Sequence, residues 1–257
     1  MDTELLFKYN NQLRHSDPIE FHGILLYPVL YKDNDAYNIF VRCLTYNPIY
    51  YEDVELSSLP RLYFITSVLK EDIRKVNPLR KAFFTELCGI MKLVLREQTF
   101  EFAPTPGGQF ALEVTSGQNK VLITAKKFDE MRRIILLQND TYCEERYIHP
   151  DILRWIEEQK TNERKHTSEK YVETPEDCVE VLMLKMHNPD EHFLDNMAIR
   201  RVNRLHEKIL NEQVFDAQIH GQFSGMVTFK EEPVSWAVTR PKQSDFDKYL
   251  KELKPRY

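Results

Sequence analysis

The chain has 257 residues, of which 42% are hydrophobic and 29% are charged, a globular composition that excludes wholesale disorder. Its formal net charge of −5 disfavours a general nucleic-acid-binding protein, because such proteins usually carry a basic excess. Since no apolar run approaches the ~20 residues that cross a bilayer and no apolar signal segment begins the chain, we expect a soluble cytoplasmic protein with no membrane partner.

The number of glycines gives information on the fold, and the spacing of the cysteines gives information on the state of their thiols. There are only 7 glycines, which favours helices over a fold built on many tight turns, because turns with positive φ use glycine. The four cysteines lie far apart and include no C-x-x-C pair. We therefore expect reduced and mostly buried thiols at Cys43, Cys88, Cys143 and Cys178.

The first part of the chain combines one short strand with several helices. Residues 24–27 suit a buried strand that the following proline would end. Apolar residues at helical spacing then predict helices over 34–46, capped by Asp33, over 57–76, and over 79–97. The apolar face of the third helix is wide, which indicates burial against more than one neighbour.

From residue 99 the period of the apolar pattern changes from 3.6 to 2, which indicates β-structure. Alternating segments at 99–102, 110–114 and 121–124 are separated by turn residues and predict a β-hairpin. Helices over 127–138 and 151–160 follow. We therefore expect a predominantly helical α+β fold, with a small antiparallel sheet in the N-terminal part and a helical C-terminal part.

One polar stretch of the sequence predicts that the chain consists of two domains. Residues 157–171 contain almost no apolar side chain and mix both charge signs, so we interpret them as an exposed helix end and a flexible linker. The predicted organisation is an α+β domain over 1–160, a polar linker over 161–172, and a helical domain with an extended strip over 173–257. Whether the linker is disordered or continues a helix is left open.

The C-terminal domain begins with a strong helix start at Thr174-Pro175-Glu176-Asp177. Threonine caps the helix, proline suits its first turn, and the two acids face the positive end of its dipole. A long helical region over 195–220 changes phase near Asn211 and forms one helix or two. Beyond it we expect a short strand or an extended strip over 226–229, and then extended chain and a short terminal helix.

No spacing of residues predicts catalysis, a cofactor or a metal site. His187 and His192 are zinc- or iron-type ligands, but the Asn-Pro step between them breaks the helix, which favours a polar turn. Neither a glycine-rich phosphate loop nor a nucleophile with its base is indicated. We therefore expect a binding protein without catalytic residues, metal or cofactor.

A short run of arginines is the first candidate for binding. Arg200, Arg201 and Arg204 place a positive strip on one side of a helix. Such a strip is typical of a phosphate contact or of a solvated, partner-facing surface. The acidic residues nearby and the net charge of −5 favour the second interpretation.

A cluster of tyrosines is the second candidate. Tyr46, Tyr50 and Tyr51 combine apolar area with a polar tip, a pattern that favours interfaces. The same residues serve equally well to pack a loop onto a core, and both interpretations stay open.

Three segments resemble one set of proteins. These segments are FHGILLYPVLYKDNDAYNIFVRCL at 21–44, FDEMRRIILLQND at 128–140, and the helical stretch 196–221 followed by FSGMVTFKEEPVSWAV at 223–238. Each is similar to a part of tailed-bacteriophage proteins that are encoded among tail genes. Those proteins are described as tail or baseplate assembly chaperones, or as tail proteins of unknown role. The resemblance covers about a third of the chain and implies an assembly partner but no catalytic residue.

The resemblance implies a non-enzymatic factor or structural component that binds a phage tail or baseplate protein, in the host cytoplasm or in the virion. The residues expected to contact this partner are Tyr46, Tyr50, Tyr51, Phe223, Met226, Phe229 and Trp236. One alternative is a nucleic-acid-associated protein that uses the strip from Arg200 to Arg204, and another is an enzyme of an unrecognised family. The identity of the partner and the oligomeric state are left open.

Overall fold

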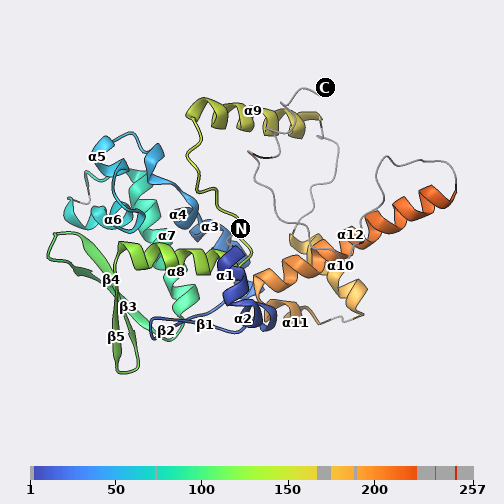
Figure 1. The fold of residues 1–257 in the computed structure, drawn as a ribbon, viewed down its shortest axis with the longest axis horizontal. Coiled ribbons are helices and arrows are strands. Elements are labelled where there is room, and N and C mark those ends of the chain that lie inside the picture. Colours follow the sequence, from blue (N-terminus) through green and yellow to red (C-terminus); the bar gives the residue numbers. More distant parts are fainter. Residues whose placement is uncertain are drawn as a thin grey trace.

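The computed structural model describes residues 3–72, 74–166, 175–187 and 190–224, together with Ser235 and Asp247. The elements of its first part are α1 (Thr3–Lys8), α2 (Asn10–His15), β1 (Ile19–Phe21), β2 (Ile24–Leu26), the 3-10 turn η1 (Tyr31–Asp33), α3 (Asn34–Phe40), α4 (Arg42–Thr45), η2 (Pro48–Tyr50), α5 (Val54–Ser57), α6 (Arg61–Thr66) and η3 (Ser67–Lys70). They are followed by α7 (Pro78–Leu95), β3 (Thr99–Pro104), β4 (Phe110–Ser116), β5 (Asn119–Ile123), α8 (Ala125–Gln138), α9 (Pro150–His166), α10 (Pro175–Met186), α11 (Glu191–Asp195) and α12 (Ile199–Phe223) (Figure 1). The predicted class, a mostly helical α+β protein with a small antiparallel sheet, is confirmed.

Helix α7 lies at the centre of the main hydrophobic core. Asn77 caps its start by accepting a hydrogen bond from the backbone N–H of Leu79, and Pro78 occupies its first turn. Its wide apolar face packs against α3, α4, α6 and β2, as the sequence predicted. The close approach of α3 requires a glycine, because a Cβ atom at Gly89 would lie 2.7 Å from the ring of Phe40.

Two small antiparallel sheets complete this part of the fold (Figure 1). Strands β1 and β2 are joined by His22 and Gly23, whose φ angles of 51° and 87° suit a two-residue hairpin turn. The second sheet has the order β3-β4-β5, and its central strand buries Ala111, Leu112 and Val114. The β-structure predicted after residue 99 is confirmed and has three strands, whereas β1 was not predicted.

Several predicted helices differ from the observed ones. The single helix expected over 57–76 is wrong, because Pro60 separates α5 from α6, and the chain leaves helical geometry after η3. The helix expected over 34–46 is divided into α3 and α4. The helix expected over 151–160 continues to His166, so residues 161–166 of the predicted linker are helical. The remainder of that linker, 167–172, lies outside the described residues.

Helix α12 is one continuous helix of 25 residues, so the change of phase near Asn211 does not divide it. Its distal part extends away from the body of the protein (Figure 1). Its first part packs with α10, α11 and η1 around a second, smaller core. The fully buried residues of this second core are Tyr31, Leu182, Leu194 and Val202.

The start of α12 is also fixed to the main core. Ile199 belongs to that core, and its backbone N–H donates to the carbonyl of Val29 at 2.9 Å. Arg200 Nη1 donates to the carbonyl of Leu137 at 2.7 Å and to the Asp140 carboxylate at 3.4 Å. Although the division into two domains stays a prediction, the first turn of α12 is therefore held by residues that lie before the proposed linker.

The tight α3–α7 contact generates a prediction for Gly89→Ala. In an unobstructed helix this substitution stabilises by about 1 kcal/mol. Here the added methyl group would overlap the Phe40 ring, so we expect a loss of about 1–3 kcal/mol in the free energy of unfolding, measured by denaturant titration. In a Phe40→Ala background the same substitution should stabilise, and a loss of equal size in both backgrounds would contradict the proposed clash.

Candidate functional site

A groove of about 660 Å³ lies between the α1–α2 pair and the first part of α12. We call it the α1–α12 groove, and Figure 1 shows its two walls side by side where α12 leaves the body. The wall from α1 and α2 consists of Leu6, Phe7, Asn10, Leu13 and Arg14. The wall from α12 consists of Arg200, Arg201, Arg204, Leu205 and Lys208.

Helical spacing brings these side chains to the groove. On α12, the residues that line it between 201 and 208 follow the spacing i, i+3, i+4, i+7 of a single helical face. On the opposite wall, which is made of two short helices, Leu6, Asn10 and Leu13 follow the spacing i, i+4, i+7. Tyr9 continues the helical hydrogen bonding between these helices, since its N–H donates at 3.0 Å and its carbonyl accepts at 2.9 Å.

The groove is strongly cationic. Five of the side chains that line it are arginine or lysine and none is acidic, although the net charge of the chain is −5. Arg201 donates a long bond of 3.4 Å to the backbone carbonyl of Arg14. Within the described part of the chain, no carboxylate lies within ion-pair distance of Arg14, Arg201 or Arg204. Their charge is therefore not neutralised by any carboxylate that the structure describes.

The three arginines of the predicted strip do not share one role. Arg200 is buried, and its guanidinium group donates hydrogen bonds to the Leu137 carbonyl and the Asp140 carboxylate. Burial lowers the pKa of Arg200, the neighbouring Arg204 lowers it further, and Asp140 opposes them. Arg200 thus has a structural role, whereas Arg201 and Arg204 line the groove.

Apolar side chains share the groove with these cations. Phe7 is 88% exposed, which is unusual for a large aromatic residue, and it lines the groove together with Leu13 and Leu205. This wall was not predicted from the sequence. An apolar spacing typical of a helix is present over 5–13, but the sequence does not indicate which distant helix it faces.

The three tyrosines predicted as partner contacts are all half-buried. Tyr46 and Tyr51 pack on the ring of Phe64, with centroid distances of 6.0 and 5.1 Å. Tyr50 stacks on Tyr147 at 5.8 Å, and its hydroxyl accepts a hydrogen bond from the N–H of Ile148 at 2.9 Å. They pack a loop onto the body, so a partner contact by these residues stays a prediction.

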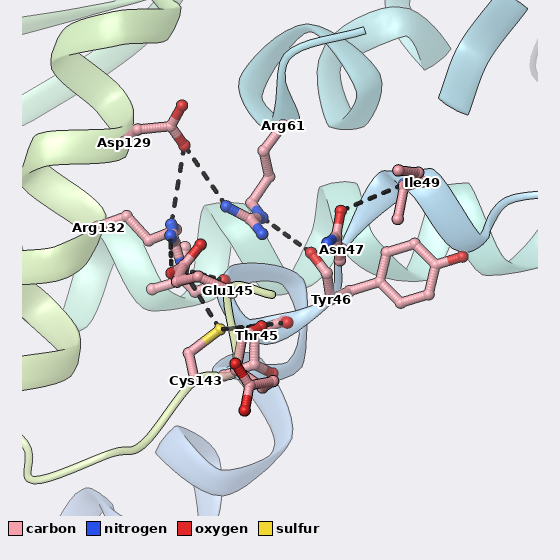
Figure 2. A network of polar contacts seen from close by, with 11 residues as sticks. Thr45, Tyr46, Asn47, Ile49, Arg61, Asp129, Arg132, Cys143 and Glu145 are labelled. Atoms are coloured by element: carbon pink, nitrogen blue, oxygen red, sulfur yellow. Dashed lines mark hydrogen bonds and ion pairs between the residues drawn. The ribbon is translucent and has the colours of Figure 1, made fainter. Parts of the chain in front are cut away.

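A buried arginine network holds that loop in place (Figure 2). Arg132 donates to the carbonyl of Leu44 at 3.1 Å, and Arg61 donates to the carbonyl of Tyr46 at 2.8 Å. Asp129 lies within 3.5 and 3.7 Å of the two guanidinium groups. Because the last carbonyls of a helix have no partner within it, these arginines complete the C-terminal end of α4.

The thiol in the same network is not activated. The Cys143 Sγ lies 3.5 Å from the carbonyl of Thr45 and 3.5 Å from Arg132 (Figure 2). Burial raises the pKa of the Cys143 thiol and the nearby Glu145 raises it further, while Arg132 and Arg61 oppose them. A thiol with a raised pKa is a poor nucleophile, so the network is structural.

The remaining predicted contacts lie at the C-terminal end. Phe223 is 87% exposed at the last residue of α12. Met226, Phe229 and Trp236 lie outside the described residues.

Across the described ranges, no group of three or more His, Cys, Asp or Glu side chains is arranged to hold a metal ion. None of the helices that the structure describes combines the length and the apolar character needed to cross a bilayer.

Comparison of the chain with known protein families, with curated proteins and with solved structures gives no match in any of the three. Its function must therefore be inferred from its own residues.

The buried network generates a prediction for Arg132→Met. We expect the free energy of unfolding to fall by about 2 kcal/mol, because the buried carbonyl of Leu44 loses its donor. Alkylation of Cys143 by iodoacetamide, followed by mass spectrometry, should become faster as the loop loosens. The exposed neighbour provides the control: Arg133→Met should change stability by less than about 0.5 kcal/mol. Equal effects of the two substitutions would contradict a special role for Arg132.

Proposed function

We propose that this chain is a non-enzymatic binding protein, and specifically a tailed-phage assembly factor or structural component that binds a tail or baseplate protein. The observation that carries the proposal is the α1–α12 groove, which combines the exposed ring of Phe7 with three arginines that pair with no carboxylate in the described part of the chain. Such a surface suits a partner that is both apolar and acidic. The resemblance of three segments to phage tail-gene products supplies the class of partner.

The side chains of the buried arginine network and of the groove favour a binding role over an enzymatic one. The arginines of the buried network already bind backbone carbonyls and carboxylates, and the thiol beside them has a raised pKa. The described residues that line the groove include cations and apolar groups but no carboxylate, histidine, cysteine or hydroxyl side chain. On this proposal the protein acts in the host cytoplasm during assembly or remains in the virion.

Nucleic-acid binding is the second candidate function. It is favoured by Arg14, Arg201 and Arg204 around the exposed ring of Phe7, because cations and aromatic rings together bind single strands. The net charge of −5 weighs against it. Binding to phosphate would weaken steeply with salt, which separates this candidate from a mainly apolar protein contact.

The proposal predicts the outcome of a pull-down with the tail and baseplate proteins that are encoded beside this chain. The tagged wild-type protein should retain one of them in stoichiometric amount, identified by mass spectrometry. The double variant Arg201→Glu/Arg204→Glu should retain at least about tenfold less, because it replaces two attractive charges with repulsive ones.

The control is Arg74→Glu/Lys75→Glu, which makes the same change in net charge at two exposed positions outside the groove. It should retain the partner as the wild type does. Circular dichroism of both variants checks that they are folded. Failure of the wild-type protein to retain any tail or baseplate protein, or equal retention by the groove variant, contradicts the proposal.

A further inference from the structure

We infer that the α1–α12 groove binds an acidic amphipathic helix of the partner protein. This inference rests on the proposed function, and it names the segment of the partner that the groove recognises. It is drawn from the shape of the groove, its charge and its apolar lining.

The shape of the groove favours a helix over an extended peptide. Both walls are helical, and the backbone groups of helical residues are largely used within the helices themselves. An extended peptide, which must pair its own backbone with an exposed strand edge, would find no such edge here. A helix satisfies its own backbone and presents only side chains. The α12 wall from 201 to 208 is about 10 Å long, which matches roughly two turns of a bound helix.

The charge of the groove selects an acidic partner. Arg14, Arg201 and Arg204 have no carboxylate partner within the described part of the chain, and Lys208 adds a further cation on the same face of α12. The N-terminal end of α12 contributes the positive end of its dipole, and its first turn contains no acidic residue. Carboxylates of a bound helix would therefore meet a positive field from both walls.

The apolar lining favours a protein helix over nucleic acid as the ligand of the groove. The half-buried Leu6 and Leu205 make no favourable contact with a phosphate backbone, whereas they suit the apolar stripe of an amphipathic helix. Phe7, which is largely exposed, would be covered by such a stripe. The segment 225–257 of this chain is a poor occupant, because it contains more lysine and arginine than aspartate and glutamate.

The inference can be tested with synthetic peptides and the full-length protein. The first peptide has leucines at the spacing i, i+3, i+4, i+7 flanked by glutamates, the second replaces every glutamate by lysine, and both carry a fluorescent label. The third probe is a labelled single-stranded oligonucleotide. Fluorescence anisotropy gives the affinity of each probe at two salt concentrations.

We expect the acidic peptide to bind and the basic peptide to bind at least about tenfold more weakly. Arg201→Glu/Arg204→Glu should weaken binding of the acidic peptide about tenfold or more, whereas Arg74→Glu/Lys75→Glu should leave it unchanged. Phe7→Ala tests the apolar contact without loss of folding, because the ring is exposed, and should weaken binding several-fold. Binding should also weaken as salt is raised.

Equal binding of the two peptides, or an affinity for the acidic peptide that does not change in the groove variant, overturns the inference. Tighter groove-dependent binding of the oligonucleotide overturns it in favour of nucleic acid. Concentration-dependent dimerisation that the groove variant abolishes, measured by light scattering, would assign the groove to a second copy of the chain. If a tail protein is still retained through the groove while the acidic peptide does not bind, only this inference fails; if neither binds, the proposed function fails as well.

Discussion

The turn that ends α8 is the constraint on which the rest of the structure depends, because it connects three parts of the chain that are distant in sequence. Gln138 Nε2 donates to the carbonyl of Leu26 in β2 at 3.0 Å, and Asn139 Oδ1 accepts from the N–H of Val29 at 2.9 Å. Arg200 of α12 donates hydrogen bonds to Leu137 and Asp140 at the same turn. All of these groups are buried, so each would carry a desolvation cost if its partner moved away. The position of α12, and with it one wall of the groove, follows from these bonds.

Two neighbouring arginines on α12, Arg200 and Arg201, have different roles because they differ in burial. Arg200 and Arg201 differ by about 100° of rotation around the helix axis, so one side chain is buried against Leu137 and Asp140 and the other is exposed. The buried group is compensated by a carbonyl and a carboxylate, as Arg132 is in its own network. Arg201, in contrast, makes one long bond to the Arg14 carbonyl and has no carboxylate partner within the described residues. This difference distinguishes an arginine that stabilises the fold from one that is available to a partner.

The protein combines rigid and projecting parts, which is compatible with the proposed binding role. The tyrosine loop over 46–51 is fixed by buried arginines and by ring stacking, so any partner that touched it would meet a preorganised surface. Helix α12, in contrast, projects from the body beyond the groove (Figure 1) and ends at the exposed Phe223. A partner seated in the groove would therefore have further apolar surface within reach along the same helix.

The sequence by itself determined the fold class, the helices α7, α8 and α10, the helical character of the α12 region, and the β-structure after residue 99, because local periodicity and turn chemistry act over short distances. It also singled out Arg201 and Arg204. Only the tertiary structure decided that Arg200 is buried, that Pro60 divides a predicted helix, and that α1–α2 forms the other wall of the groove. The contact between Arg14 and Arg201 joins residues 187 positions apart. No local pattern encodes such a pairing, because it depends on the packing of the whole core.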